Sequence, residues 1–298
     1  MSMPRASEGV RPAGAAAPHQ LRRREFDLIC RTMHDNFGID LQGKEVLVAA
    51  RLGKKLRELE IQTFEQYWEV IQRDSSGETL TAMVDALTTN HTSFFREMQH
   101  FEYLRTSVLP SMSSSGQIRI WSAACSTGEE PYSIAFTLLQ ALGPQTTSRI
   151  RILATDISTR VLAIAESGTY SAERVLSMAA DQQRRCLLKG SGPSEGTYKV
   201  KQEIQSLISF RRMNLMEDFS HVGSFSVIFC RNVMIYFDRK TQESLVNRLT
   251  ACLEPGGHLL IGHAESLNGI DHDLRYVRPA TYRKSATSPI FFNRRRSD

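Results

Sequence analysis

The chain of 298 residues is 41% hydrophobic and 23% charged, and it carries a net charge of +5 at pH 7. Its length favours two domains, no apolar run is long enough to cross a membrane, and its five cysteines form no CxxC pair. These features argue against a membrane-inserted or disulfide-stapled protein and predict reduced thiols in the cytoplasm. A pI near 9.0 is compatible with acidic partners, nucleic acid included, but requires none.

The first part of the chain predicts a small all-helical domain over 21–89. Residues 1–20 are rich in Ala, Pro, Gly and Ser, which indicates a disordered tail. Apolar residues then recur at helical spacing, and the second helix is expected over about 44–59. A capping-box pattern begins at Thr63 and opens a third helix, and a fourth follows over about 78–88.

Beside the apolar face of the second of these helices lie Lys44, Arg51 and Lys55, with Lys54 close by. Three of these residues are grouped within five positions: Arg51, Lys54 and Lys55. We call them the basic stripe. A charged helix face is usually only solvated. The same side chains are also suited to docking on an acidic helix of a partner. The residues alone leave both interpretations open.

Residues 90–116 are predicted to form a linker. The stretch from Thr88 to Glu97 is polar, then aromatic, then charged, with no amphipathic period. Such a segment is suited to covering a ligand, and it is equally compatible with an ordinary linker. Arg96 follows two phenylalanines and is compatible with a packing residue whose head group reaches solvent. A helix after it is expected to stop at Pro110.

The stretch from Gln117 to Tyr132 predicts a strand, a loop of small residues and the start of a helix. This order opens a doubly wound nucleotide-binding sheet. Gly128 is the only glycine of the loop, so the dinucleotide signature is weak. Glu129 and Glu130 at the helix start would repel a pyrophosphate. A cofactor with hydroxyls and positive charge therefore fits better.

A further acidic residue, Asp156, follows the next predicted strand, over 150–153. A carboxylate at the carboxyl end of the second strand is suited to accepting both hydroxyls of a ribose. The alternative is that Asp156 caps the helix that begins near Ser158. We favour ribose binding.

The stretch 168–206 interrupts the alternation of strands and helices. It contains a turn cluster over 189–196 and an alternating segment over 197–201, which predict an inserted helix and a small antiparallel β subdomain. Three further strands complete the main sheet, over 208–210, 225–229 and 258–261. The middle one is apolar throughout, as in a buried central strand. Apolar stretches near Tyr276 and over 289–292 predict a terminal hairpin.

Five ordered stretches together resemble the CheR-type chemotaxis receptor methyltransferases, which use S-adenosylmethionine to methylate glutamates. They are Thr88 to Glu97, Trp121 to Ile134, Ala154 to Ile157, Asn214 with Leu215, and Phe229 to Phe237. The stretch from Gly262 to Leu267 is similar to a further family signature, and the resemblance covers about 22–292. It implies an α/β fold, with a Rossmann-like methyltransferase domain over 117–298 after the helical domain.

The resemblance implies a set of S-adenosylmethionine contacts: Asn90, Thr92, Arg96, Glu129, Asp156, Asn214, Leu215, Asn232 and Val233. In this set, Asp156 would bind the ribose, Asn214 and Leu215 would lie beside the adenine, and Asn232 and Val233 would lie near the methionine part. Arg96 and Tyr236 resemble the catalytic pair next to the reacting methyl group. Two positions depart from the pattern, with Cys125 where many relatives carry Ala and His91 where others are apolar.

The chemistry supports this interpretation independently. Methyl transfer from a sulfonium is an in-line displacement, and a glutamate is already ionised near neutral pH, so no general base is needed. The enzyme has to position the cofactor and the glutamate, exclude water from around them and place charges near the reacting atoms. One arginine, Arg96, would orient the incoming carboxylate or hold that of the cofactor, and Tyr236 would donate a hydrogen bond. The sequence shows no Ser-His-Asp arrangement and no metal cluster, so no metal is expected.

The implied partners are methyl-accepting chemoreceptors, whose signalling regions are long helices that bear several glutamates. The basic stripe would then contact an acidic receptor helix. We expect a cytoplasmic monomer that binds no nucleic acid. Two alternatives remain: a non-catalytic cofactor-binding signalling module, and an enzyme of the same fold that acts on nucleic acid. The second would need aromatic platforms near the crevice, and we identify none in the sequence.

In some members of the family, a β subdomain at this place captures the flexible C-terminal tail of the receptor. The alternating segment Tyr198 to Lys201 is suited to forming an exposed edge to which an extended peptide adds as a strand. Lys199 and Lys201 would share one face of that strand and meet an acidic tail. The alternative is that the loop only closes a hairpin, with the lysines protecting a bare edge against aggregation.

Overall fold

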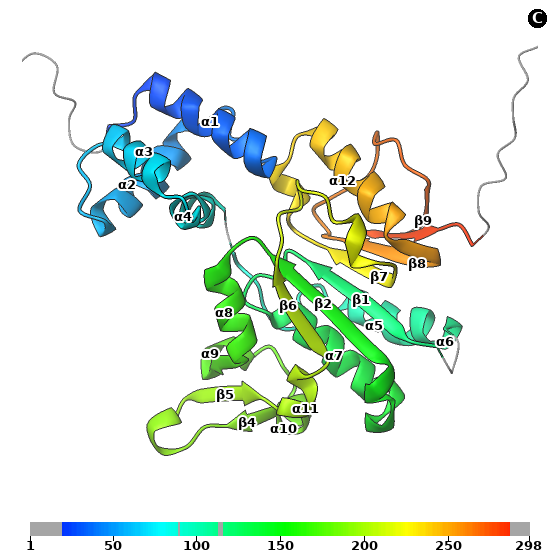
Figure 1. Cartoon of the computed structure of the whole chain (residues 1–298). Helices are drawn as coiled ribbons and strands as arrows, with labels where there is room; N and C mark the ends of the chain where they lie inside the picture. Colours follow the sequence, from blue (N-terminus) through cyan, green and yellow to red (C-terminus); the bar gives the residue numbers. More distant parts are fainter. Residues whose placement is uncertain (1–19, 89, 113–115, 287–298) are drawn as a thin grey trace, which may run out of the picture. The chain divides into compact units, whose positions relative to one another are not determined.

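We analysed a computed structural model of the chain, which describes residues 20–88, 90–112 and 116–286 (Figure 1). The chain divides into two compact units. The first combines the stretch up to Met33 with Leu41–Thr88, and the second combines His34–Asp40 with the stretch from Thr89 onward. Residues 1–19 of the predicted disordered tail lie outside the described residues.

The first unit is helical. It contains most of α1 (Arg23–Phe37) together with α2 (Glu45–Glu58), α3 (Phe64–Arg73) and α4 (Glu78–Leu87). Its core includes Val48, Leu52 and Leu56, which are fully buried on one face of α2, as their spacing predicts. The capping box at α3 is confirmed: Thr63 Oγ1 accepts from the Gln66 N–H at 3.2 Å, and the Gln66 side chain accepts from the Thr63 N–H at 3.3 Å.

The second unit is organised around a seven-stranded sheet with the order β6-β2-β1-β7-β8-β10-β9. The strands are β1 (Ile118–Ala123), β2 (Ile150–Asp156), β6 (Ile208–Arg212), β7 (Phe225–Cys230), β8 (Leu253–Ile261), β9 (Leu274–Arg278) and β10 (Thr281–Lys284). The first five in spatial order are parallel, and β10 is antiparallel to both of its neighbours. The chain leaves β1 toward β2 on one side and returns beside it as β7, so a crevice is expected at the carboxyl ends of these strands.

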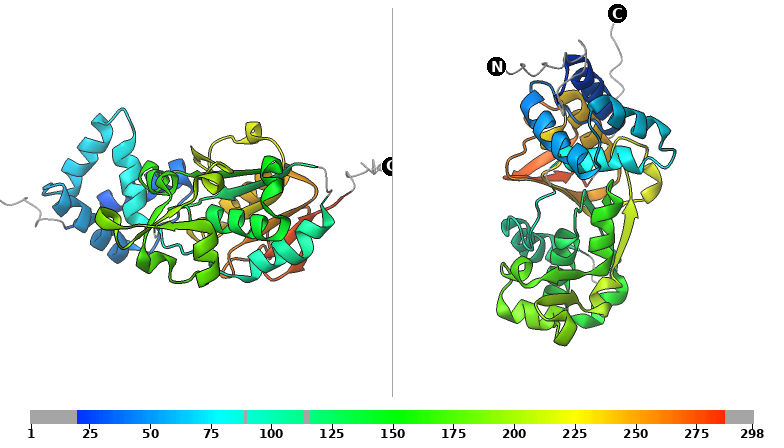
Figure 2. Two further views of the ribbon diagram at one scale, coloured as in Figure 1. Left: turned by 90° about the horizontal axis from the view of Figure 1, so that it is seen from below. Right: turned by 90° about the vertical axis from the view of Figure 1, so that its left-hand side faces the viewer.

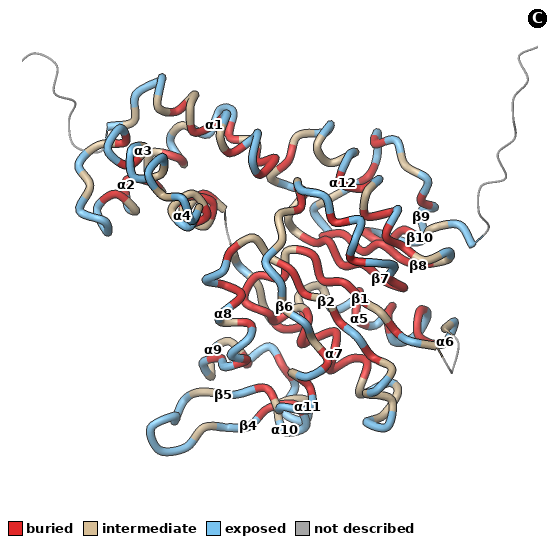
Figure 3. The backbone as a smooth tube through the Cα atoms, in the orientation of Figure 1, coloured by how far each residue is buried: buried red, intermediate tan, exposed pale blue. Residues whose placement is uncertain are grey.

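The inner strands form the most deeply buried part of this unit (Figure 3). Every residue of β7 is buried, which confirms the prediction of an apolar central strand. The stretch from Asn90 to Glu97 belongs to the same unit, and Phe94 and Phe95 are 1% and 6% exposed in its main core. Two adjacent aromatic anchors, directly before Arg96, therefore fix this part of the chain to the sheet domain.

Three long helices connect the strands: α7 (Glu129–Leu142), α8 (Thr159–Ser167) and α12 (Arg239–Ala251), seen from two further sides in Figure 2. Before β1, the chain forms α5 (Gln99–Tyr103), a π-helical turn (Leu104–Val108) and α6 (Leu109–Ser111). The helical stretch therefore ends at Ser111, one residue past the predicted stop at Pro110. Proline is tolerated because it lies in the first turn of α6, where its missing N–H is not required.

The predicted insert contains a separate three-stranded antiparallel sheet with the order β3-β5-β4. Its strands are β3 (Thr169–Ser171), β4 (Leu187–Lys189) and β5 (Thr197–Val200), with the short helices α9 (Ala172–Val175), α10 (Ala180–Cys186) and α11 (Gln202–Gln205) between and after them. The small antiparallel subdomain is thus confirmed. The expectation that the segment around Lys199 forms an edge is wrong, because β5 pairs on both sides and β3 and β4 are the edges.

The end of the described chain is a hairpin of β9 and β10. Tyr276 lies in β9 as expected, but its partner strand is β10, whereas the stretch 289–292 lies outside the described residues. All five cysteines are buried and unpaired by disulfides, as predicted. Within the described ranges, the helices are too short or too polar to span a bilayer.

Candidate functional site

The loop between β1 and α7 is shaped by small residues with unusual backbone angles. Ala124 and Ser126 have φ of 64° and 49°, and Gly128, which caps α7, has φ of 94°. A Cβ at Gly128 would lie 2.8 Å from the Cβ of Ala165, so only glycine fits there. The Ser126 hydroxyl donates to the main-chain oxygen of Asn90 at 3.1 Å. The loop is therefore tied to the segment that carries Arg96.

Asp156 lies at the end of β2 and faces this loop. Its Oδ2 accepts from the Ser126 N–H at 2.8 Å, and its Oδ1 accepts from the Ser158 N–H at 3.0 Å. The helix α8 is capped by Ser158, whose hydroxyl accepts from the Val161 N–H at 3.3 Å. The capping alternative for Asp156 is therefore wrong, and the carboxylate is fixed at the crevice end of the sheet. Its role as a ribose ligand stays a prediction.

The first turn of α7 contains a buried carboxylate, Glu129, and a half-buried one, Glu130, with different partners. Glu129 is fully buried, forms an ion pair with Arg174 and accepts from the Thr127 hydroxyl at 2.8 Å. Burial raises the pKa of Glu129, while Arg174 acts in the opposite direction. Glu130 accepts from the Ser122 hydroxyl at 2.7 Å and pairs with Arg231 at 2.8 Å. The predicted acidic contact, Glu129, is thus paired inside the protein.

The loop between β1 and α7 forms one wall of the site, and the segment after β7 forms the second. Asn232 has φ of 58°, its N–H donates to Glu265 Oε2 at 3.0 Å, and its side chain donates to Glu97 Oε1 at 3.3 Å. A Cβ at Gly262 would lie 2.9 Å from the Asn232 nitrogen, so the end of β8 can approach this turn only as glycine. Glu97 and Asn232 are 135 residues apart, and their contact joins the linker to this wall.

The remaining predicted residues lie at the margins of these two walls. Val233 and Tyr236 are half-buried, with Tyr236 in a 3₁₀ turn (Met234–Tyr236) whose last carbonyl accepts from the Asp40 N–H at 2.7 Å. After β6, the Asn214 side chain donates to the Asn36 carbonyl at 2.8 Å, and Leu215 is buried. Residues 34–40 therefore support both Tyr236 and Asn214.

Arg96 and Thr92 are half-buried in the linker. The Arg96 guanidinium donates to the His91 carbonyl at 2.9 Å, so its own segment holds the side chain in place. The main-chain carbonyl of Arg96 accepts from Arg231 at 2.6 Å. Both segments of the predicted catalytic pair thus belong to one unit, and Arg96 is bound through its backbone to the end of β7.

Backbone strain is concentrated here. Seven non-glycine residues in the described part of the chain have positive φ, and five of them lie in this site: Phe95, Glu97, Ala124, Ser126 and Asn232. Such conformations cost about 1–3 kcal/mol each and persist only where the surrounding structure enforces them. The clustering points to a region shaped for binding rather than for stability alone.

Several charged residues of the site were not predicted from the sequence. Arg174, Arg231 and Glu265 all contact residues of the walls, yet none was singled out. Arg231 and Glu265 do stand inside two of the matching stretches, and that position was the available signal.

Glu97 lies in a cluster with two histidines. Glu97, His100 and His263 offer ligand atoms within 4.8 Å of one another, a spacing compatible with a metal. However, Arg231 lies 3.0 Å from Glu97 Oε2, so a metal ion there would meet a like charge. Burial and Arg231 lower the pKa of His100 to about 3, and its ring stacks edge-on against His263 at 4.9 Å. The carboxylate is already neutralised without a metal.

The helical unit carries the basic stripe on α2. Lys54 is exposed and lies 3.9 Å from Glu58, whereas Arg51 is half-buried and donates to the Leu87 carbonyl at 2.5 Å. Lys55 is half-buried. Val46, on the same helix, is 85% exposed, so apolar surface accompanies the charges. Arg51 has a structural contact, and the two lysines are the more available members.

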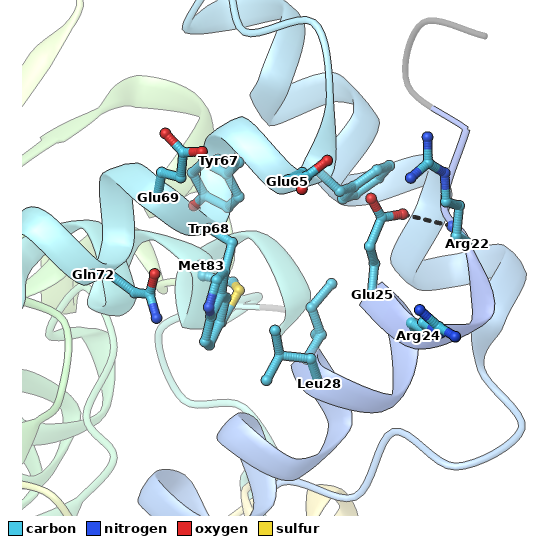
Figure 4. A pocket seen from close by; sticks show the side chains of 12 residues that line it. Arg22, Arg24, Glu25, Leu28, Glu65, Tyr67, Trp68, Glu69, Gln72 and Met83 are labelled. Carbon is cyan, nitrogen blue, oxygen red and sulfur yellow. Dashed lines mark hydrogen bonds between the residues drawn. The ribbon is translucent and has the colours of Figure 1, made fainter. Parts of the chain in front are cut away.

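A hollow of about 460 Å³ lies between α1 and α3 in the same unit (Figure 4). Leu28 and Trp68 face one another across it, Met83 lines its floor, and Glu25 and Glu65 lie on the rim. None of the basic-stripe residues lines this hollow. It is a second, separate surface of the helical unit.

In the small sheet, Lys199 is exposed on the central strand β5, and Lys201 lies beyond the strand as the N-cap of α11. The two lysines therefore do not form the predicted common face of an edge strand. An added strand would have to pair with β3 or β4 instead.

The fold and site together define a class of protein. A doubly wound sheet, an acidic residue at the end of β2 and a loop of small residues before α7 are typical of proteins that bind a nucleoside cofactor. The two carboxylates at the start of α7 are each paired with an arginine, and the Asp156 carboxylate at the crevice end of the sheet is of the type that binds the hydroxyls of a nucleoside. The class is that of S-adenosylmethionine-dependent methyltransferases.

Comparison with known proteins identifies the family. Residues 90–283 match the CheR methyltransferase, SAM binding domain, and residues 24–88 match the CheR methyltransferase, all-alpha domain. This chain belongs to the CheR methyltransferase family, and its cofactor is S-adenosylmethionine. The predicted family, fold class and cofactor are thereby confirmed, and neither alternative function is favoured.

Named relatives cover most of the chain. Chemotaxis protein methyltransferase 2 of Pseudomonas aeruginosa is 42% identical over 87% of this chain and 92% of its own length. The chemotaxis protein methyltransferase of Salmonella typhimurium is 40% identical over 82% of this chain and 84% of its own. That of Escherichia coli is 39% identical over 83% and 85%.

Proposed function

We propose that the protein methylates glutamate side chains of methyl-accepting chemoreceptors in the cytoplasm and forms glutamyl methyl esters. The names of its relatives as chemotaxis protein methyltransferases support the receptor as substrate. A carboxylate acceptor is ionised at neutral pH and needs no base. The cofactor supplies an activated methyl group, and the protein supplies position and charge.

The observation that carries this proposal is the junction of the linker with the turn after β7. Glu97 bonds the Asn232 side chain at 3.3 Å, and Arg231 bonds the Arg96 carbonyl at 2.6 Å. These contacts bring the backbone that bears Arg96 to the segment that leads to Tyr236. In our proposal, Arg96 orients a carboxylate, and Tyr236 donates a hydrogen bond beside the transferred methyl group.

The same proposal assigns the cofactor contacts. Asp156 would accept the ribose hydroxyls, which is supported by its fixed place beside Ser126. Asn214 and Leu215 would border the adenine. The other proposed contacts come from the linker and the two walls: Asn90, Thr92, Glu129, Asn232 and Val233.

Receptor binding is proposed for the basic stripe on α2. Lys54 and Lys55 would meet glutamates of a receptor helix, and the exposed Val46 would add apolar contact. A receptor tail would add as a strand to β3 or β4, the two edges of the small sheet. Such a tether would raise the local concentration of receptor without taking part in the chemistry.

The test is transfer of labelled methyl from S-adenosylmethionine to membranes that contain chemoreceptors. We expect label in the receptor that is released by mild base, because an ester is base-labile. Membranes from cells without receptors are the control. Base-stable label, or label that appears only on nucleic acid, would refute the glutamate assignment.

A further inference from the structure

Arg231 is a buried cation with acceptors on two distant parts of the chain. Its side chain is 2% exposed. Nη1 donates to Glu130 Oε2 at 2.8 Å, in the first turn of α7. Nη2 donates to the Arg96 carbonyl at 2.6 Å and lies 3.0 Å from Glu97 Oε2, both in the linker. One planar group therefore spans the linker, the end of β7 and the start of α7.

Arg231 lies nearer to Glu97 Oε2 than the basic side chain of His263 does, at 3.0 Å against 3.9 Å for His263 Nε2. Burial raises the pKa of Glu97, but Arg231 and Asn232 outweigh that effect and the net pKa is lowered. His100, the nearby buried base, is neutral at physiological pH, since its pKa is about 3. Without Arg231, two half-buried carboxylates, Glu97 and Glu130, would lose their shared cation, which is unfavourable.

The two groups that accept hydrogen bonds from Arg231, the Arg96 carbonyl and the Glu130 carboxylate, lie in segments whose backbone shapes the site. The bond to the Arg96 carbonyl lies between Phe95 and Glu97, whose φ angles of 56° and 57° are strained for side-chain-bearing residues. The bond to Glu130 fixes the turn that begins at Gly128. The three N–H donors of a lysine all radiate from one nitrogen, whereas the two terminal nitrogens of the arginine fork each reach one of these acceptors.

We propose that Arg231 is a positioning residue, which aligns the Arg96 segment with the start of α7 before either substrate binds. This inference deepens the proposed function and rests on it for the identity of the methyl acceptor. Arg231 does not touch the reacting atoms; it acts through the backbone of Arg96 and the side chain of Glu130. Misplacement of a reacting group by about 1 Å costs on the order of 100-fold in rate.

The main test compares Arg231→Lys with Arg119→Lys in the full chain. Arg119 is a matched control because it also donates to a main-chain carbonyl, that of Val222 at 3.1 Å, and lies over an aromatic ring, that of Phe225, but it stands at the amino-terminal end of β1, whereas the site is at the carboxyl ends of the strands. At saturating cofactor and receptor, we expect kcat to fall between about 10- and 100-fold in Arg231→Lys and less than twofold in Arg119→Lys. A kcat within twofold of wild type for folded Arg231→Lys would overturn the proposal.

A second variant keeps the inference testable if Arg231→Lys folds poorly. Glu130→Gln preserves shape and removes one charged partner, and we expect kcat to fall with little change in thermal stability. In a cycle with Arg231→Met, the two effects should be non-additive, because each breaks the same link. Additive effects, or a loss of stability with unchanged kcat per folded molecule, would assign Arg231 a purely structural role.

The affinity for S-adenosylhomocysteine, measured by calorimetry, separates this inference from the proposed function. If the wild type binds it but makes no base-labile ester on receptors, the glutamate assignment fails. Positioning is then still tested on whichever acceptor the wild type methylates. If the wild type makes the ester and Arg231→Lys does so at the same rate, only the positioning role fails.

Discussion

Arg231 with its two glutamates and the basic stripe on α2 use the same kinds of residue in opposite surroundings. The Arg231 side chain is 2% exposed and bonds Glu130 at 2.8 Å, whereas Lys54 is 76% exposed and lies 3.9 Å from Glu58. A buried, hydrogen-bonded charge fixes the backbone around it and is little affected by salt. An exposed charge contributes little to stability and remains available to a partner. Burial, more than residue type, separates a charge that builds the site from one that attracts a substrate.

The largest expected effect concerns the predicted catalytic pair, Arg96 and Tyr236, whose segments adjoin Arg231. Arg96→Ala and Tyr236→Phe should each lower kcat, by about 100-fold for the arginine, because a charged hydrogen-bond donor beside the reacting group is lost. Turnover at saturating cofactor and thermal melting should be measured together. Arg105→Ala and Tyr276→Phe, at exposed positions, are the matched controls. Normal kcat in both site variants would remove them from the mechanism.

The next effect concerns cofactor affinity. Asp156→Asn should weaken binding of S-adenosylmethionine by about 1.5–3 kcal/mol, as expected for a lost hydrogen bond to a charged group. The amide keeps one oxygen for the Ser126 or Ser158 N–H but loses the charge. Calorimetric titration measures the change, with the exposed Asp181→Asn as control. Equal affinity in both variants would refute the ribose assignment.

A smaller, salt-dependent effect is expected for the two lysines of the basic stripe. Lys54→Glu with Lys55→Glu should slow receptor methylation several-fold at low salt, and the difference should shrink as salt is added. These two lysines are preferable to Arg51, whose bond to the Leu87 carbonyl makes its replacement a stability change. Reversal of the exposed Arg184 and Arg185 on α10 is the control. Rates that match the control at every salt concentration would leave the stripe as a solvated face.

The smallest effect concerns a half-exposed pair. His34 Nε2 lies 2.7 Å from Asp238 Oδ2, and this bond and that to Asp35 raise the pKa of His34. A raised pKa stabilises the fold below the unfolded value near 6.5, and the contribution is lost as pH rises through the folded pKa. Wild type should therefore melt slightly above His34→Gln in mild acid. The gap should close at alkaline pH and also in strong acid, where Asp238 is protonated. A gap that is constant with pH would exclude the ion pair as its cause.

Much of the fold was predictable because its signals are local. The apolar run of β7, the apolar face of α2 and the capping box at Thr63 depend on neighbours within a few residues. Pairing between distant segments was not predictable from spacing. Tyr198 to Lys201 alternates as an edge strand would, yet β3, some 30 residues earlier in the sequence, covers its second side. A local pattern gives the strand but not the number of its partners.

The site shows the same limit. Asp156 was predictable from its place after a strand, and Arg96 and Tyr236 came from the resemblance. Arg231 was not singled out because its partners are 101 and 135 residues away, and a single arginine after an apolar strand resembles a solvated charge. Only the folded chain shows that its side chain is buried and which carbonyl it bonds.

The cluster of left-handed residues in the site has a consequence for protein engineering. Ala124, Ser126 and Asn232 have φ of 64°, 49° and 58°, a conformation that glycine adopts without strain. Searches for heat-resistant variants should therefore be drawn to glycine at these positions, where relief of strain competes with a more disordered unfolded chain. The same replacements would remove side chains from the cofactor loop and the wall opposite it. Thermal resistance and turnover should thus diverge at these positions, and selection for one alone would be expected to erode the other.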